Sequence, residues 1–172
     1  MLCLKKELYS EIIGYLRGIA NLVSFYGVCY GHSYRFLEYE YSSDINESLE
    51  AFLESGLVNR NKTIIKGLEQ LADWKGEIFN SCSEWFFSLF SMQNFKITLE
   101  DENGYVIPAE KHRNSNYVVN ELLCLLDEFF SGTDIIVYRL VTDPNNIDEF
   151  GWEEFFFDCG KKVYVLHFYQ YG

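Results

Sequence analysis

The sequence predicts an α+β protein, a single domain of about four helices packed on a small, mostly antiparallel sheet. Apolar residues recur at helical spacing through much of the first two thirds of the chain, whereas short apolar runs separated by turn residues dominate its last forty residues. The 172 residues contain only two prolines, and no linker-like or repetitive stretch divides them. Because compact domains usually have about this length, we expect residues 1–172 to form one domain that ends in a β-meander.

Two helices are expected in the first third of the chain. Between Leu4 and Val23 the apolar positions return every three or four residues, which is typical of an amphipathic helix. Asp44 and Glu47 have the spacing of a capping box, which predicts a short helix that ends at Gly56. The segment between these helices, residues 24–43, is interpreted as either a strand or an irregular aromatic segment.

The middle of the chain predicts a third helical region and a hairpin. Apolar residues from about Asn61 to Leu89 follow a helical stripe with Gly76 as a possible break, so this region is either one long helix or two. Residues 95–99 then alternate between apolar and polar, and Asn103-Gly104 suits the type I′ turn of a hairpin that returns through residues 105–107.

The last third predicts one more helix and three strands. The helix runs from about Asn116 to Phe130 and closes at Gly132. Residues 135–141 form a nearly continuous apolar run, which favours a strand covered on both faces. Residues 152–157 and 163–169 flank a short turn and complete the expected meander.

Composition and charge restrict the class of protein. The 26 acidic residues outnumber the 14 lysines and arginines, and the resulting net charge of −12 disfavours nucleic acid and favours a basic partner. No apolar run approaches the roughly 18 residues of a membrane span, and Lys5 and Lys6 interrupt any leader-like segment. Five scattered cysteines without a CxxC pair do not suggest a disulfide framework. We therefore expect a cytoplasmic protein that does not bind membranes.

Catalytic and metal-binding signatures are missing from the sequence. It contains no GxGxxG, Walker, GxSxG or HExxH motif, so we expect no enzyme activity, no catalytic residue and no cofactor. Cys29 and His32 are the only cysteine and histidine close together in the sequence, and a small buried thiol is the simpler interpretation of Cys29. The remaining cysteines and histidines are too scattered to predict a zinc site. His167 is expected to be a hydrogen-bonded structural residue.

Acidic and aromatic residues are interleaved in two stretches, Glu38–Glu54 and Asp143–Asp158. Together these hold nearly half of the acids, and neither contains a lysine or arginine. Carboxylates steer a cationic partner, and large aromatic side chains dominate the energetic centres of interfaces, so such a surface suits a basic protein. The alternative is that the acids are solvated faces and the aromatics belong to the core.

The residues 151–157 and the ending 163–168 resemble the terminal strands of immunity proteins of bacterial toxin systems, including those of contact-dependent inhibition and polymorphic toxins. Small size, acidity and aromatic content agree with that resemblance. It implies a protein that neutralises a cognate toxin domain, often a basic nuclease, by occluding its active site with carboxylates in place of phosphates. The candidate contact residues are then Glu38, Tyr39, Glu40, Tyr41, Asp148, Glu149, Trp152, Glu153 and Glu154. The competing hypotheses are a small enzyme of an unrecognised family and a generic acidic adaptor.

Overall fold

The computed structural model describes most of the chain, namely residues 2–26, 31–40, 44–57, 64–92, 99–100, 103–107, 113–143 and 151–171. Its elements in chain order are α1 (Leu2–Tyr26), β1 (Gly31–Glu40), α2 (Ile45–Glu54), β2 (Ile65–Gln70), α3 (Trp74–Met92), β3 (Leu99–Glu100), β4 (Val106–Ile107), α4 (Arg113–Phe130), β5 (Ile136–Thr142), β6 (Trp152–Asp158) and β7 (Lys162–Tyr171).

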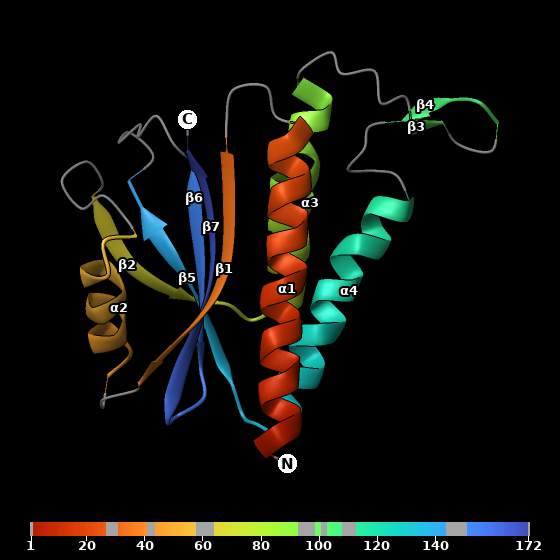
Figure 1. Cartoon of the computed structure of the whole chain (residues 1–172). Helices are drawn as coiled ribbons and strands as arrows, with labels where there is room; N and C mark the ends of the chain where they lie inside the picture. The colour runs from red at the N-terminus through yellow and green to blue at the C-terminus, as the bar shows by residue number, and fades with distance from the viewer. Residues whose placement is uncertain are drawn as a thin grey trace.

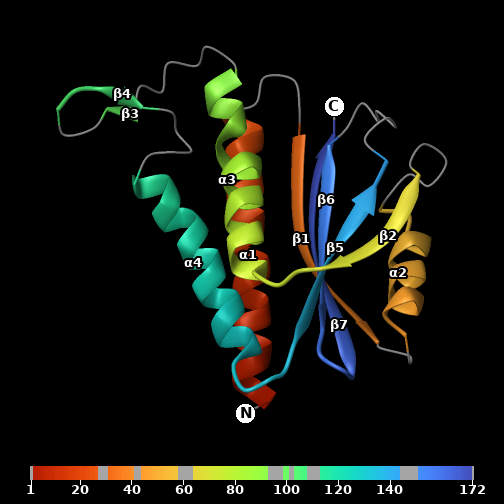
Figure 2. The same ribbon diagram turned by 180° about the vertical axis from the view of Figure 1, so that it is seen from behind.

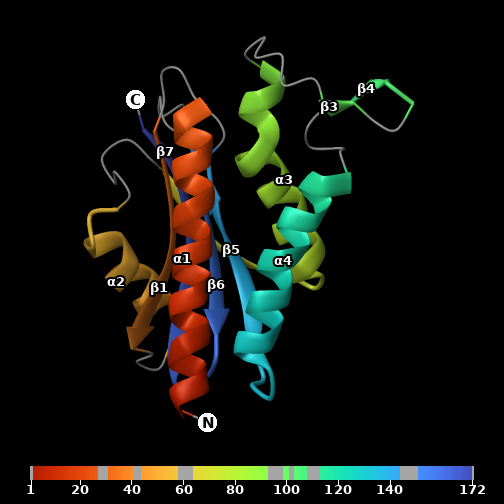
Figure 3. The ribbon, with the colours of Figure 1, turned by 45° about the vertical axis from the view of Figure 1, so that its right-hand side comes forward.

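Five of these strands form one sheet in the order β1-β7-β6-β5-β2, with every neighbouring pair antiparallel. The predicted α+β class and the C-terminal meander of β5, β6 and β7 are thereby confirmed. Helices α1, α3 and α4 cover one face of the sheet and α2 covers the other, which gives three layers (Figures 1 and 2). Figure 3 shows α1 running alongside β1, while α3 and α4 lie further along the same face.

Each face of the sheet has its own hydrophobic core. Phe155 and Phe157 point into the larger core beneath α1, α3 and α4, and Phe156 between them points into the smaller core beneath α2. Side chains alternate across a strand, so this run of three phenylalanines fills both cores. All three are completely buried.

The strand that is buried on both faces differs from the one the sequence suggested. The apolar run at 135–141 predicted such a strand, but several residues of β5 are only half-buried. β6 and β7 are the covered strands, since most of their residues are buried, although β5 is also an inner strand of the sheet.

The predicted third helical region is wrong in its first half. Residues 65–70 form the edge strand β2, which pairs with β5 and contains an irregularity at Gly67, whose φ is +129°. Helix α3 begins only at Trp74, and the Asp73 carboxylate accepts a hydrogen bond from the backbone N–H of Gly76 at 3.1 Å. Gly76 therefore lies in the first turn of a helix and does not interrupt one.

The other expected elements are confirmed within the described residues. Residues 31–40 are a strand, which settles the alternative left open for the aromatic segment after the first helix. β3 pairs with β4 across a turn in which Gly104 has a φ of +78°, while residues 95–98 lie outside the described part of the chain. α4 ends just before Gly132, whose φ is +71°. Among the described helices, none is both long and apolar enough to cross a membrane.

Candidate partner-binding surface

The acids of α2 form an exposed row on the outer side of the helix. Asp44 caps the helix by accepting a hydrogen bond from the backbone N–H of Asn46 at 2.9 Å. Glu47, Glu50 and Glu54 follow at spacings of three and four residues, which place them on one side of the helix. The side chains of all four acids are exposed, whereas the opposite side of α2 is buried against the sheet. We call Asp44, Glu47, Glu50 and Glu54 the α2 acidic stripe.

Two of the predicted contact residues, Glu38 and Glu40, lie near the end of edge strand β1. Both side chains are exposed, and Glu40 precedes the α2 acidic stripe by only four residues along the chain. Glu38 forms an ion pair with Lys162 of the neighbouring strand, so part of its charge is balanced within the molecule. Side chains alternate along β1, so Glu38 and Glu40 point to the same side as Phe36, toward α1 and away from α2, and neither adjoins the α2 acidic stripe.

The predicted aromatic contacts Tyr39 and Trp152 are half-buried and lie apart. Both pack against the core beneath α2, and the Tyr39 ring meets the Phe52 ring almost at a right angle, with 6.2 Å between ring centroids. In the sheet Tyr39 is opposite Val163 and Trp152 is opposite Tyr169. Six residues of strand β7 span roughly 20 Å, so these two aromatic side chains do not form one patch.

Glu153 is an internal anchor between α3 and the sheet. Its carboxylate accepts hydrogen bonds from the Ser81 hydroxyl at 2.9 Å and from the indole N–H of Trp85 at 2.8 Å, and it forms an ion pair with Arg139. Only 12% of its side chain is exposed. With its oxygens engaged in this way, Glu153 holds structure together, and we remove it from the predicted contact surface.

Glu154 is also removed from the predicted contact surface, because its side chain is completely buried. It points to the opposite face of β6 from Glu153, into the core beneath α2, where its Oε1 lies 2.8 Å from Nδ1 of His167. The prediction that His167 is a hydrogen-bonded structural residue is thus confirmed. The ring of Phe52 packs edge-on against this imidazole.

Burial favours the uncharged forms of both partners in this pair. It raises the pKa of Glu154 well above the ordinary value, and the neighbouring Glu153 carboxylate raises it further. Burial lowers the pKa of His167 to about 4, with a smaller contribution from Arg35. A protonated Glu154 can then donate its hydrogen bond to a neutral imidazole. With exposed fractions of 0 and 1%, the pair is sealed from substrate and is not arranged as an acid–base site.

Potential metal or thiol chemistry finds little support in the described part of the chain. No group of three or more histidine, cysteine or acidic side chains within it is placed to hold a metal ion. Cys82 is completely buried, and burial raises the pKa of its thiol. The hypothesis of a Cys29–His32 pair involves Cys29, which lies outside the described residues, and a His32 side chain that is itself buried.

The nine predicted contact residues are not brought together as one surface. Tyr41, Asp148 and Glu149 lie outside the described residues. Of the remainder, Glu40 and Glu38 lie beside α2 along the chain, while Glu153 and Glu154 face opposite sides of the sheet. The α2 acidic stripe lies within the acidic stretch Glu38–Glu54. Its spacing of three and four residues is the signal in the sequence that could have identified it as one exposed side of a helix.

Comparisons with models of protein families, with curated proteins and with solved structures find no match to this chain. A function must therefore be inferred from the residues of the chain itself.

Proposed function

We propose that this protein is an immunity protein that binds and neutralises a basic toxin domain. The α2 acidic stripe is the proposed contact surface. The observation that carries this proposal is the row of four exposed carboxylates along one side of a helix whose other side is anchored in the core.

The electrostatics of this region support a cationic partner. From Glu38 to Glu54 the chain contains six acids and no lysine or arginine, in a protein whose net charge is −12. Such a surface accelerates the association of a positively charged protein and presents carboxylates where a nuclease would hold phosphates. Because α2 packs on the sheet through buried Leu49, Phe52 and Leu53, its acids are held on a rigid element.

A growth-rescue experiment tests the proposal. The protein would be co-expressed with the C-terminal domain of any toxin found to be encoded directly upstream of its gene, and we expect growth to be restored. The variant Glu47→Gln, Glu50→Gln, Glu54→Gln should lose most of this protection at limiting expression, with association at least about tenfold slower at low salt.

A control variant separates the stripe from overall charge. Glu11, Glu121 and Glu128 are exposed acids on α1 and α4, and their replacement by glutamine removes the same charge from the other side of the sheet. This control should protect as well as the unaltered protein. Equal protection by both variants would remove the α2 acidic stripe from the proposal, and failure to protect by the unaltered protein would remove the immunity function.

Stoichiometry distinguishes inhibition from catalysis and from simple adaptor binding. An inhibitor should abolish toxin activity at one molecule per toxin molecule, whereas an enzyme that inactivates the toxin would do so at much lower ratios. An adaptor would bind the toxin and leave its activity intact. We expect the titration to end at a one-to-one ratio.

A further inference from the structure

A pocket on the side of the sheet covered by α1, α3 and α4 gathers lysines in this otherwise acidic molecule. Its volume of about 450 Å³ is within the range of small-molecule sites. Four of the 14 basic residues of the chain line it, namely Lys5, Lys6, Lys161 and Lys162. Glu38 is the single acid among the described residues of its lining, so the pocket carries a net positive charge.

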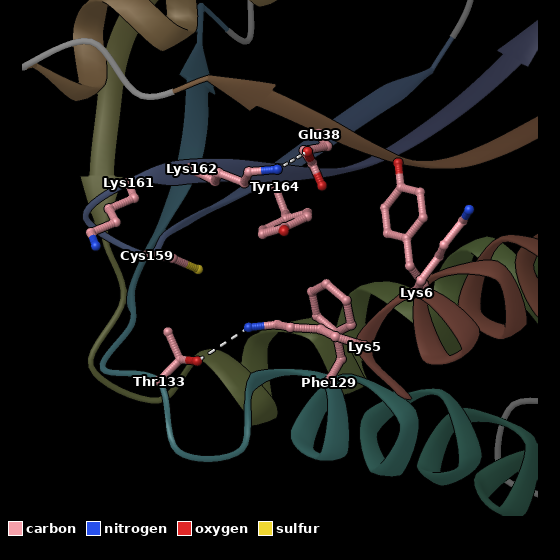
Figure 4. Close-up of a pocket in the computed structure, with 10 residues that line it drawn as sticks. Lys5, Lys6, Glu38, Phe129, Thr133, Cys159, Lys161, Lys162 and Tyr164 are labelled. Carbon is pink, nitrogen blue, oxygen red and sulfur yellow. Dashed lines mark hydrogen bonds and ion pairs between the residues drawn. The ribbon is translucent and has the colours of Figure 1, made fainter. Parts of the chain in front are cut away.

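The fold brings these lysines together from opposite ends of the sequence. Lys5 and Lys6 lie at the start of α1, and Lys161 and Lys162 lie at the turn between β6 and β7. That turn is tight, because Gly160 has a φ of +73° and its N–H donates to the Asp158 carboxylate at 2.7 Å. Figure 4 shows the Lys5 and Lys162 side chains on opposite sides of the pocket.

The positive charge is only partly balanced by the pocket's own residues. Lys162 is paired with Glu38, whereas the ammonium group of Lys5 donates to the neutral Thr133 hydroxyl at 3.3 Å. Within the described part of the chain, no carboxylate forms a salt bridge with Lys5, Lys6 or Lys161. Three ammonium groups are thus available to an anion.

An aromatic surface lies between these cationic groups. Tyr164 meets Phe129 edge to face at 4.9 Å between ring centroids, and Tyr9 lies 6.2 Å from Tyr164. The Lys5 ammonium is 5.3 Å from the centre of the Phe129 ring, so charge and ring adjoin directly (Figure 4). Phe129 and Tyr164 are themselves almost completely buried, so they form an aromatic floor to the pocket beneath its rim of lysines.

The thiol of Cys159, which also lines the pocket, is held in its neutral form. Burial raises the pKa of this thiol to about 11. Lys5 lowers the pKa and Asp158 raises it, and both effects are smaller than that of burial. Because the thiolate is the nucleophilic form of cysteine, this residue contributes an apolar wall and no covalent chemistry.

We propose that this pocket binds a small organic anion whose phosphate or carboxylate is held by Lys5 and Lys161 and whose flat apolar ring packs over Phe129 and Tyr164. Such a site is separate from the proposed toxin-binding surface, because α2 lies on the other side of the sheet (Figure 1). A ligand here would bind a different part of the molecule from a toxin.

Isothermal titration with four probes tests this proposal. 1-Naphthyl phosphate and 1-naphthoate carry the ring with either anion, inorganic phosphate carries the charge alone, and 1-naphthol carries the ring alone. We expect saturable one-to-one binding of at least one naphthyl anion, at least about tenfold tighter than inorganic phosphate or 1-naphthol. The preferred naphthyl anion identifies which headgroup the site takes.

Lysine variants place the binding in this pocket. Lys5→Met with Lys161→Met preserves side-chain length and should weaken binding of the preferred probe about tenfold or more, since each lost charged hydrogen bond has an effect of that order. The matched control is Lys66→Met, which removes a lysine on β2 outside the pocket and should bind as the unaltered protein does. Circular dichroism verifies that each variant is folded.

Three outcomes would overturn the proposal: no saturable binding of either naphthyl anion, equal affinity for inorganic phosphate, or unchanged affinity in the Lys5 and Lys161 variant. None of these outcomes bears on toxin neutralisation. Growth rescue by the Lys5 and Lys161 variant should equal that of the unaltered protein, so the two proposals fail independently.

Discussion

At the scale of single residues, two adjacent acids of β6 have opposite environments. Glu153 points toward α3 and is bound by Ser81, Trp85 and Arg139, while Glu154 points toward α2 and is hydrogen-bonded to His167. Because neighbouring side chains of a strand face opposite sides of a sheet, one carboxylate meets Arg139 in an ion pair, while burial raises the pKa of the other and favours its neutral form.

The Glu154–His167 pair gives a specific dependence of stability on pH. In the unfolded chain the ordinary pKa values are 4.5 for the glutamate and 6.5 for the histidine. Between pH 4.5 and 6.5 the pair holds one proton in each state, on Glu154 when folded and on His167 when unfolded. The pair therefore does not make the free energy of unfolding depend on pH in this window. Above pH 6.5 only the unfolded pair loses that proton. Stability then falls by up to about 1.4 kcal/mol per pH unit until the raised pKa of Glu154 is passed.

On the acidic side the sign is the opposite. Below pH 4.5 the unfolded pair gains a second proton that the folded His167, with a pKa of about 4, does not yet take up. Stability therefore falls as the pH decreases from 4.5 toward 4. The pair contributes most to stability in the window between pH 4.5 and 6.5.

Glu154→Gln tests this account, because glutamine keeps a hydrogen-bonding side chain but has no proton that titrates between pH 6.5 and 8.5. Urea unfolding followed by tryptophan fluorescence at pH 6.5, 7.5 and 8.5 should show a decline for the unaltered protein that is absent or much smaller in the variant. Glu11→Gln, at an exposed position, is the matched control and should parallel the unaltered protein. Parallel curves for Glu154→Gln and the unaltered protein would show that Glu154 is ionised in the folded state.

At the scale of elements, α2 is the sole helix described on its face of the sheet, and its ten residues are few for an independently stable helix. Its stability depends on the apolar contacts of Leu49, Phe52 and Leu53 and on the cap supplied by Asp44. The same cap residue begins the α2 acidic stripe, so one side chain serves both the helix and the proposed contact surface.

Removing this cap should destabilise the protein measurably. Asp44→Ala leaves the N–H of Asn46 without its side-chain acceptor, and we expect a loss of about 1 kcal/mol in the free energy of unfolding. Asp44→Asn retains an acceptor at the cap and should lose only a few tenths of that. Urea denaturation of the two variants side by side measures the difference. If both lose the same amount, the charge of Asp44 matters and its hydrogen bond does not.

At the scale of the whole molecule, the net charge of −12 opposes folding through self-repulsion. Positive side chains are concentrated at the pocket lined by Lys5 and Lys162, while the α2 acidic stripe lies beyond the opposite face of the sheet. The lysine-lined pocket and the α2 acidic stripe thus lie on opposite sides of the sheet, where they suit two different ligands.

Self-repulsion predicts that salt stabilises this protein. The melting temperature should rise by a few degrees between 20 mM and 300 mM sodium chloride, as the Debye length shrinks and distant acids are screened from one another. The variant Glu11→Lys, Glu121→Lys reduces the formal charge to about −8 and should show a smaller rise. Differential scanning calorimetry measures both. An equal rise in the two proteins would attribute the effect of salt to something other than net charge.

Local patterns in the sequence were sufficient for a large part of the fold. The apolar repeat of Leu4–Val23, the cap at Asp44 and the glycines at 104 and 132 each act within a few residues, and the corresponding elements are present. The same holds for the C-terminal meander, whose strands follow one another along the chain and pair with their neighbours.

Only the tertiary structure decided how β2 forms and which charged residues belong together. The apolar spacing of residues 64–71 fits a helix as well as a strand, and pairing with β5, some seventy residues later, selects the strand. Likewise, no pattern among neighbouring residues in the sequence shows that Glu154 is buried and Glu40 exposed, or that Lys5 and Lys161 line the same pocket. Periodicity and caps are properties of neighbours along the chain, whereas burial, strand pairing and shared pockets depend on contacts between residues that the sequence keeps far apart.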